Sequence, residues 1–186
     1  MAGPRLLIVL DPVEALNPRS SERALKEMLV CTDERWVVHM LHSRYVDYEG
    51  LPCRYVVHKV PFGSRPRSPI FKIMYLIAAI FVGVKAVKED RIHLVLCKGG
   101  HLYLGPVAFL VARLTGRRCL IRVNEDAIFM LEVFLRRSGL PGPLVEFLGA
   151  LGRKLERFLL KHVDWVVTHG PMDYERIKNE ITDRVS

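Results

Sequence analysis

Short apolar runs of strand length alternate with longer helical patterns along the chain. Each run is close to continuous in Leu, Ile, Val and Cys rather than alternating with polar residues, which is typical of strands buried on both faces of a sheet. The runs that predict strands are Leu6–Leu10, Trp36–Leu41, Cys53–Val60, Ile92–Cys97, Cys119–Val123 and Val163–Thr168.

Helical patterns fill most of the intervals between these runs. Asn17-Pro18 supplies a helix start, Pro106 opens a second helix that ends at Gly116, and residues 172–181 predict a terminal one. The clearest helical pattern is a long amphipathic one, with the apolar stripe Leu144, Phe147, Leu148, Leu151, Leu155, Phe158 and Leu159. Strands that alternate with helices predict an α/β domain: a Rossmann-like, doubly wound, mostly parallel sheet with helices on both faces.

One apolar segment allows two interpretations. The residues from Ile73 to Val84 carry no charge, and Lys72 and Lys85 flank them. A helix that spans a bilayer needs about 20 apolar residues, so this stretch is short for that purpose. The length favours a helix buried against the sheet, and peripheral insertion into a membrane is the alternative.

The composition describes one globular domain with a basic excess. The chain has 186 residues, a formal net charge of +8 and 50% hydrophobic residues, which favours anionic partners. Arg153, Arg157 and Lys161 recur every four residues on the long helix. This is either a solvated face or a surface for an anionic membrane. Nucleic acid is not predicted as a partner, because no stacked-aromatic or helix-turn-helix signal accompanies the charge.

The cysteines and histidines show no metal-binding spacing. The four cysteines form no C-x-x-C pair and lie in or beside apolar runs, which is typical of reduced, buried thiols. With no secretory signal, we expect a cytoplasmic protein, with peripheral attachment to a membrane as the open question. We predict no metal site and assign no role to the histidines His39, His42, His58, His93, His162 and His169.

Ligands of open α/β sheets bind at the carboxyl ends of the strands, and three loops follow such ends. The first, residues 11–20, has no glycine, so it carries neither a dinucleotide fingerprint nor a P-loop. Arg19 lies near a helix start and is a candidate contact for an anion. An ordinary capped loop is the alternative, and the sequence favours it.

The second loop, from Lys98 to Pro106, carries more of the groups that bind ligands. Gly99 and Gly100 let backbone N–H groups approach a ligand, and the helix that follows attracts negative charge at its N-terminus. Lys98 adds a positive charge, and His101 is able to donate or accept a hydrogen bond. The combination predicts a ligand site.

The third loop places polar groups directly after a buried strand. Burial of Asn124, Glu125 and Asp126 there is energetically unfavourable unless they are solvated, paired with other polar groups or part of a functional site. They are suited to binding sugar hydroxyls, or to serving as a general base. Equally, they suit a solvated helix start with Asp126 as its cap.

The second half of the chain also carries a recognisable series of motifs. They are Gly99-Gly100-His101, Gly105-Pro106, the sequence LVARLTG at residues 110–116, and VDWVVT at residues 163–168. In order and spacing, residues 92–168 resemble the N-terminal domain of GT-B glycosyltransferases, specifically the retaining group of mannosyl- and glucosyltransferases. The chain departs from that family in two places. It has no Gly-Gly pair after the first strand, and Asn124 stands where the family tends to have His.

The resemblance implies an acceptor-binding N-terminal domain of an enzyme that transfers a sugar from a nucleotide sugar to a lipid or saccharide. His101 and Glu125 would be the polar contacts of the reaction, with Lys98, Gly99, Gly100, Asn124, Asp126 and Arg19 binding substrate. The nucleotide sugar is a substrate, and no other cofactor or metal is expected. The family's C-terminal, donor-binding domain lies outside residues 1–186, so we expect little activity from this chain alone.

Two other classes remain open at this point. One is a non-catalytic subunit with the same fold that binds a membrane or a protein partner through its apolar and basic helices. The other is a different nucleotide-binding α/β domain, and the missing glycine fingerprint argues against it.

Overall fold

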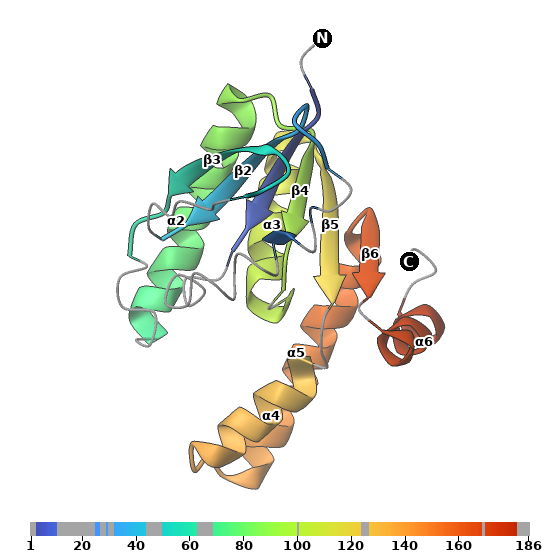
Figure 1. Cartoon of the computed structure of the whole chain (residues 1–186). Helices are drawn as coiled ribbons and strands as arrows, with labels where there is room; N and C mark the ends of the chain where they lie inside the picture. The colour runs from blue at the N-terminus through green and yellow to red at the C-terminus, as the bar shows by residue number, and fades with distance from the viewer. Residues whose placement is uncertain are drawn as a thin grey trace.

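In the computed structural model of the chain, six parallel strands form one sheet with the order β3-β2-β1-β4-β5-β6 (Figure 1). The structure describes residues 3–10, 25–26, 29, 32–43, 50–62, 69–99, 101–123, 127–168 and 170–181. All six predicted strands are confirmed. They are β1 Arg5–Val9, β2 Val37–His42, β3 Arg54–Lys59, β4 Leu94–Cys97, β5 Arg118–Val123 and β6 Trp165–Thr168.

The strand order confirms the doubly wound α/β fold. The chain proceeds outward from β1 to β2 and β3, then returns to β4, which pairs with the free side of β1. From β4 it proceeds outward again to β5 and β6. The direction of winding therefore reverses between β1 and β4, where Val9 pairs with Cys97.

Five helices are bounded in the described part of the chain: α2 Pro69–Glu89, α3 His101–Thr115, α4 Ala127–Arg137, α5 Gly142–His162 and α6 Pro171–Glu180. The helix predicted after Asn17 lies mostly outside the described residues. The predicted start of the second helix at Pro106 is wrong, because α3 begins at His101 and Pro106 lies inside it. Leu104 and Ala108 are both buried, so packing against the sheet extends the helix by the turn that contains Leu104.

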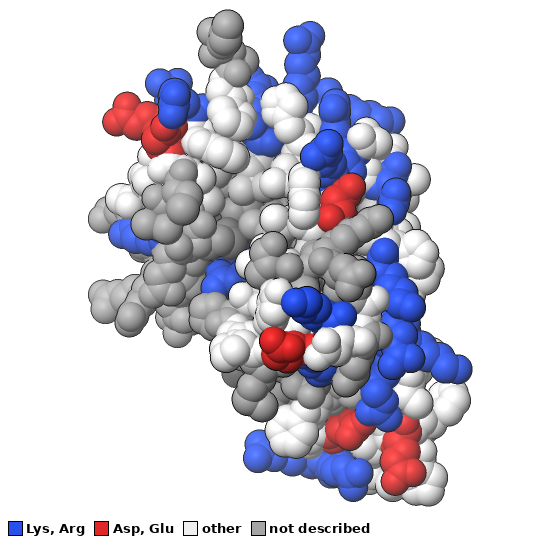
Figure 2. Space-filling model, turned by 90° about the vertical axis from the view of Figure 1, so that its right-hand side faces the viewer, with Lys and Arg blue, Asp and Glu red and all other residues white. Residues whose placement is uncertain are grey.

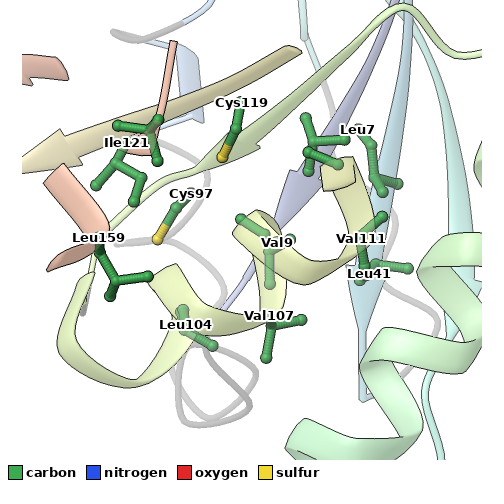
Figure 3. Close-up of a cluster of buried hydrophobic side chains, with 14 of the residues drawn as sticks. Leu7, Val9, Leu41, Cys97, Leu104, Val107, Val111, Cys119, Ile121 and Leu159 are labelled. Atoms are coloured by element: carbon green, nitrogen blue, oxygen red, sulfur yellow. The ribbon is translucent and has the colours of Figure 1, made fainter. Parts of the chain in front are cut away.

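The two faces of the sheet have separate cores. Leu7 and Val9 of β1 belong to the larger core, which α2, α3 and α5 cover (Figure 3). Leu6 and Ile8, which alternate with them, belong to the core of the other face. Figure 3 also shows Cys97 and Cys119 among the buried side chains of the larger core. Like Cys53, they are buried and form no disulfide, as predicted, whereas Cys31 lies outside the described residues.

Helix α2 is longer than its uncharged segment, and most of its residues are not fully buried. Its inner side is close to the sheet: a Cβ on Gly83 would lie 2.8 Å from Val111 of α3 and 3.1 Å from Leu41 of β2. By length and mean hydropathy alone, α2 is a candidate membrane span. One side is nevertheless buried against the domain, as predicted, while its outer side exposes Ile70, Ile73, Met74, Ile77 and Phe81.

Tyr75 attaches the first half of α2 to the end of β1. Its side chain is fully buried, and its hydroxyl donates a hydrogen bond of 3.0 Å to the Leu10 carbonyl. We expect Tyr75→Phe to lower the free energy of unfolding by about 1–2 kcal/mol, because it leaves that carbonyl buried without this donor. Urea unfolding measures the change. Phe81→Ser on the exposed side of the same helix is the control and should change stability by less than about 0.5 kcal/mol. Equal effects of the two substitutions would contradict the assignment.

Candidate functional site

The three candidate loops leave neighbouring strands. β1, β4 and β5 are adjacent in the sheet, so their carboxyl ends meet at one edge, beside the point where the winding reverses. Of the predicted site residues, the structure describes Lys98, Gly99 and His101. The other predicted site residues, Arg19, Gly100, Asn124, Glu125 and Asp126, lie outside the described residues.

The chain turns sharply as it leaves β4. Lys98 is 6% exposed, and Gly99 has a φ of 149°, a conformation that side chains with a Cβ rarely adopt. The Cys97 thiol donates to the Gly99 carbonyl at 3.2 Å across this turn. The connection from strand to helix is therefore shorter than the sequence predicted, and it brings the N-terminus of α3 close to the carboxyl end of β4.

His101 is the first residue of α3 and is buried. Its Nε2 lies 2.9 Å from Oε1 of Glu156, a buried residue in the middle of α5. Arg176 of α6 donates to both oxygens of the same carboxylate, at 3.0 and 3.2 Å. One carboxylate thus connects the start of α3 to α5 and α6. The predicted contact between His101 and a sugar stays a prediction.

The network keeps Glu156 ionised. Burial alone would raise the pKa of Glu156, but hydrogen bonds from His101 and Arg176, together with their charges, lower its pKa to about 2. An ionised carboxylate only accepts hydrogen bonds, so Nε2 of His101 carries the proton in this contact. The other ring nitrogen, Nδ1, takes no part in this contact.

The sequence-based prediction missed Glu156 and Arg176. Glu156 lies in an amphipathic helix with many charged residues, and Arg176 belongs to a short polar helix, so neither charge stands out locally. A signal for Glu156 was present, because it continues the series Val145, Gly149 and Gly152 at helical spacing. A carboxylate in line with small and apolar residues is expected to be buried.

The same series explains which side of α5 is buried. A Cβ on Gly149 would clash with Oε1 of Glu132, so α4 packs closely against this side of α5. Arg153 of α5 donates to that Glu132 oxygen at 2.8 Å. Most of the predicted apolar stripe of α5 therefore faces away from the side that packs against α4. Its exposed members are Leu144, Phe147, Leu151, Leu155 and Phe158.

The α4–α5 hairpin projects from the carboxyl edge of the sheet, beyond the end of β5 (Figure 1). Figure 2 shows a column of Lys and Arg side chains down one edge of the molecule, in the half where the hairpin lies. Lys154, Arg157 and Lys161 of α5 are all exposed. The hairpin therefore combines exposed apolar side chains with a basic surface.

Comparison with known proteins identifies the fold. No family model and no curated protein sequence matches the chain. Sucrose-phosphate synthase from Thermosynechococcus elongatus matches in structure with a TM-score of 0.60 and 13% identity, covering 98% of this chain and 86% of that one. UGT2 of Phytolacca americana, solved with UDP-2-fluoro-glucose and pterostilbene, matches with a TM-score of 0.59 and 13% identity, covering 100% and 53%. This chain has the fold of a GT-B glycosyltransferase domain.

A third solved structure shows the same fold. The lipopolysaccharide outer core galactosyltransferase WaaB matches this chain with a TM-score of 0.51 and 8% identity, and the match covers 98% of this chain and 44% of WaaB. The chain spans about half the length of UGT2 and WaaB. At these identities the likeness concerns the fold and not the substrates.

The Glu156 network makes the stability of this GT-B domain depend on pH. The pKa of Glu156 is lowered by folding, so its contribution is complete above the unfolded pKa of about 4.5 and is lost as the pH falls toward 2. Between pH 6 and pH 3, we expect the wild type to lose about 2 kcal/mol of unfolding free energy that Glu156→Gln does not lose. Urea unfolding across this range measures the difference. Glu175→Gln, on an exposed position of α6, is the control and should keep the wild-type slope.

Proposed function

We propose that this chain is the acceptor-binding N-terminal domain of a glycosyltransferase, which transfers a sugar from a nucleotide sugar to a lipid or saccharide acceptor. The observation that carries the proposal is the GT-B fold over nearly the whole chain. Solved structures with this fold contain UDP-2-fluoro-glucose in one case and UDP in others, which supports a nucleotide sugar as the donor.

The proposed site is the carboxyl edge at β1, β4 and β5. There the N-terminus of α3 and the backbone N–H of Gly99 would supply a positive field, and Lys98 would add a charge. In the proposal His101 and Glu125 are the polar contacts of the reaction, while Asn124 and Asp126 accept hydrogen bonds from sugar hydroxyls. Arg19 contacts an anionic group of a substrate.

Catalysis by such a site rests on orientation and on stabilising the charge that develops as the glycosidic bond to the diphosphate breaks. Glu156 would act through His101, because it holds the imidazole ring in one orientation and fixes the proton on Nε2. This makes Glu156 and Arg176 positioning residues in the proposal. The nucleotide of the donor would be bound by a second domain, the C-terminal half of the same enzyme.

A specific observation favours a second role, peripheral binding to an anionic membrane at the cytoplasmic face. Exposed Phe147, Leu151 and Phe158 lie on the same helix as exposed Lys154 and Lys161. Apolar side chains that insert between lipids, next to cations that contact headgroups, are the features of an interfacial helix. The net charge of +8 adds a general attraction to anionic lipid. This role would bring the site to a lipid-linked acceptor.

The site assignment is tested in the complete polypeptide that carries this chain, with a panel of nucleotide sugars and lipid-linked or free saccharide acceptors. We expect the double substitution His101→Ala with Glu125→Ala to lower the rate of sugar transfer by about 100-fold or more, because polar stabilisation of the transition state is lost. The control is His162→Ala, an exposed histidine at the far end of α5. Full activity of the double variant would contradict the assignment. If a second domain binds the donor, residues 1–186 alone should show almost no turnover.

Membrane binding is measured by sedimentation of the chain with vesicles of phosphatidylserine and phosphatidylcholine. We expect binding that weakens with added salt, and that falls about tenfold or more in Phe147→Ser with Leu151→Ser, because two apolar side chains no longer insert. Leu114→Ser, an equally exposed residue at the other end of the domain, is the control and should bind as the wild type does. Binding that is unaffected by the double substitution, or equal with neutral vesicles at all salt concentrations, would refute this surface.

A further inference from the structure

Two histidines and an aspartate that are far apart in the sequence converge at the C-terminal end of α2. Nδ1 of His39 in β2 lies 2.9 Å from Nε2 of His58 in β3. Oδ2 of Asp90, directly after α2, lies 3.5 Å from each of these two nitrogens. Among the described residues, this is the one group of at least three His, Cys, Asp or Glu side chains with ligand atoms close enough to share a metal ion.

The fold explains why these side chains meet. β2 and β3 are adjacent and parallel, with Leu41 paired to His58, so His39 and His58 lie two positions apart on the same face of the sheet. α2 crosses this face and ends at Glu89, and Arg5 at the start of β1 donates from its guanidinium to the Asp90 carbonyl. Each ligand atom is therefore held by a separate element of secondary structure.

The cluster is distant from the proposed glycosyltransferase site. Tyr75, near the start of α2, contacts Leu10 at the carboxyl end of β1. Asp90 lies at the other end of the same helix, about 22 Å further along its axis at the usual helical rise. The cluster is thus separate from the sugar-transfer edge, and its role is independent of the proposed function.

We propose that His39, His58 and Asp90 form a binding site for a divalent transition metal, with Zn²⁺ as the best fit. Two imidazoles and one carboxylate, with a position left open, are a common ligand set of zinc. Ligand atoms around a tetrahedral zinc ion lie about 3.3 Å apart. The three separations of 2.9, 3.5 and 3.5 Å lie around this value. Only the two nitrogens need to move apart, by about 0.4 Å on this geometry.

The surroundings also suit a metal ion. His39 is almost fully buried, whereas the side chains of His58 and Asp90 are 19% and 35% exposed, which leaves a path for the ion and a position for water. Burial lowers the pKa of His39 to about 4, although the negative charge of Asp90 acts to raise it. Burial lowers the pKa of His58 as well. Both rings are therefore neutral near pH 7, which is the form that coordinates metals.

The competing explanation is a hydrogen bond between two neutral imidazoles. The ring centroids are 5.2 Å apart and the rings are within 19° of parallel, an arrangement that an N–H···N hydrogen bond also adopts. Nε2 of His39 is buried without a hydrogen-bond partner, so Nδ1 is the only nitrogen of this ring that meets a polar group. Both explanations use the same atoms, and metal binding has to be measured to distinguish them.

The experiment is a titration of the 186-residue chain with Zn²⁺, and with Co²⁺ as a spectroscopic probe, in the presence of a phosphine reductant. We expect one equivalent of Zn²⁺ to bind and to raise the thermal midpoint by roughly 5 °C or more at saturation. Bound Co²⁺ should show the visible bands of a four- or five-coordinate ion with no thiolate charge-transfer band. Burial raises the pKa of the Cys53 and Cys119 thiols, so these cysteines do not compete as thiolates near pH 7.

The variants identify the ligands. Asp90→Asn, which keeps the shape of the side chain, and His58→Ala should each weaken Zn²⁺ binding by about tenfold or more and remove the thermal shift. His162→Ala removes an exposed histidine outside the cluster and should bind as the wild type does. Absence of stoichiometric binding, a Co²⁺ spectrum with thiolate bands, or affinity unchanged by Asp90→Asn would overturn the proposal in favour of the imidazole hydrogen bond. If a variant fails to fold, the Co²⁺ spectrum of the wild type still decides between these ligand sets.

Discussion

The whole structure depends on the parallel pairing of its strands. Parallel neighbours cannot be joined by a hairpin, so each connection has to cross a face of the sheet, and helices cover the larger core that results. The return from β3 to β4 contains α2. Because it brings β4 next to β1, the loops after β1, β4 and β5 share one edge. The position of the candidate site is therefore a consequence of strand pairing.

The buried carboxylate of Glu156 fixes the N-terminus of α3 at that edge. Glu156 is removed from water, which by itself is unfavourable, and its stability comes from His101 and Arg176 acting together. The three residues belong to α3, α5 and α6, so the network holds the first turn of α3 against two helices that follow later in the chain. The orientation of His101 is thus determined by residues that lie 55 and 75 positions further along. Proton position and ring orientation at the candidate site follow from this carboxylate.

The surfaces of the domain are set by close helix contacts. Gly149 allows α4 to pack on the side of α5 that carries the small residues, and the apolar stripe of α5 is consequently left exposed. In the same way Gly83 brings α2 against α3 and the sheet, and leaves Ile73 and Phe81 on the outside. Both helices are amphipathic or apolar in sequence, but the side that is buried contains the glycine in each case. The contact at Gly149 therefore leaves the α4–α5 hairpin with an exposed surface that is both basic and apolar.

Local patterns determined the fold of this chain. Continuous apolar runs such as Leu6–Leu10 indicate strands that are buried on both faces of a sheet. All six strands and the α/β class were therefore predictable from the sequence. The start of α3 was not predictable in this way, because the burial of Leu104 outweighs the local signal of Pro106 for a helix start. The tertiary structure alone decided the partners of polar residues. Glu156 with Arg176, and His39 with His58 and Asp90, are brought together by packing between elements that no sequence window contains. Hydrophobic periodicity is a property of neighbouring residues, whereas a hydrogen-bonded or metal-binding cluster is a property of distant ones.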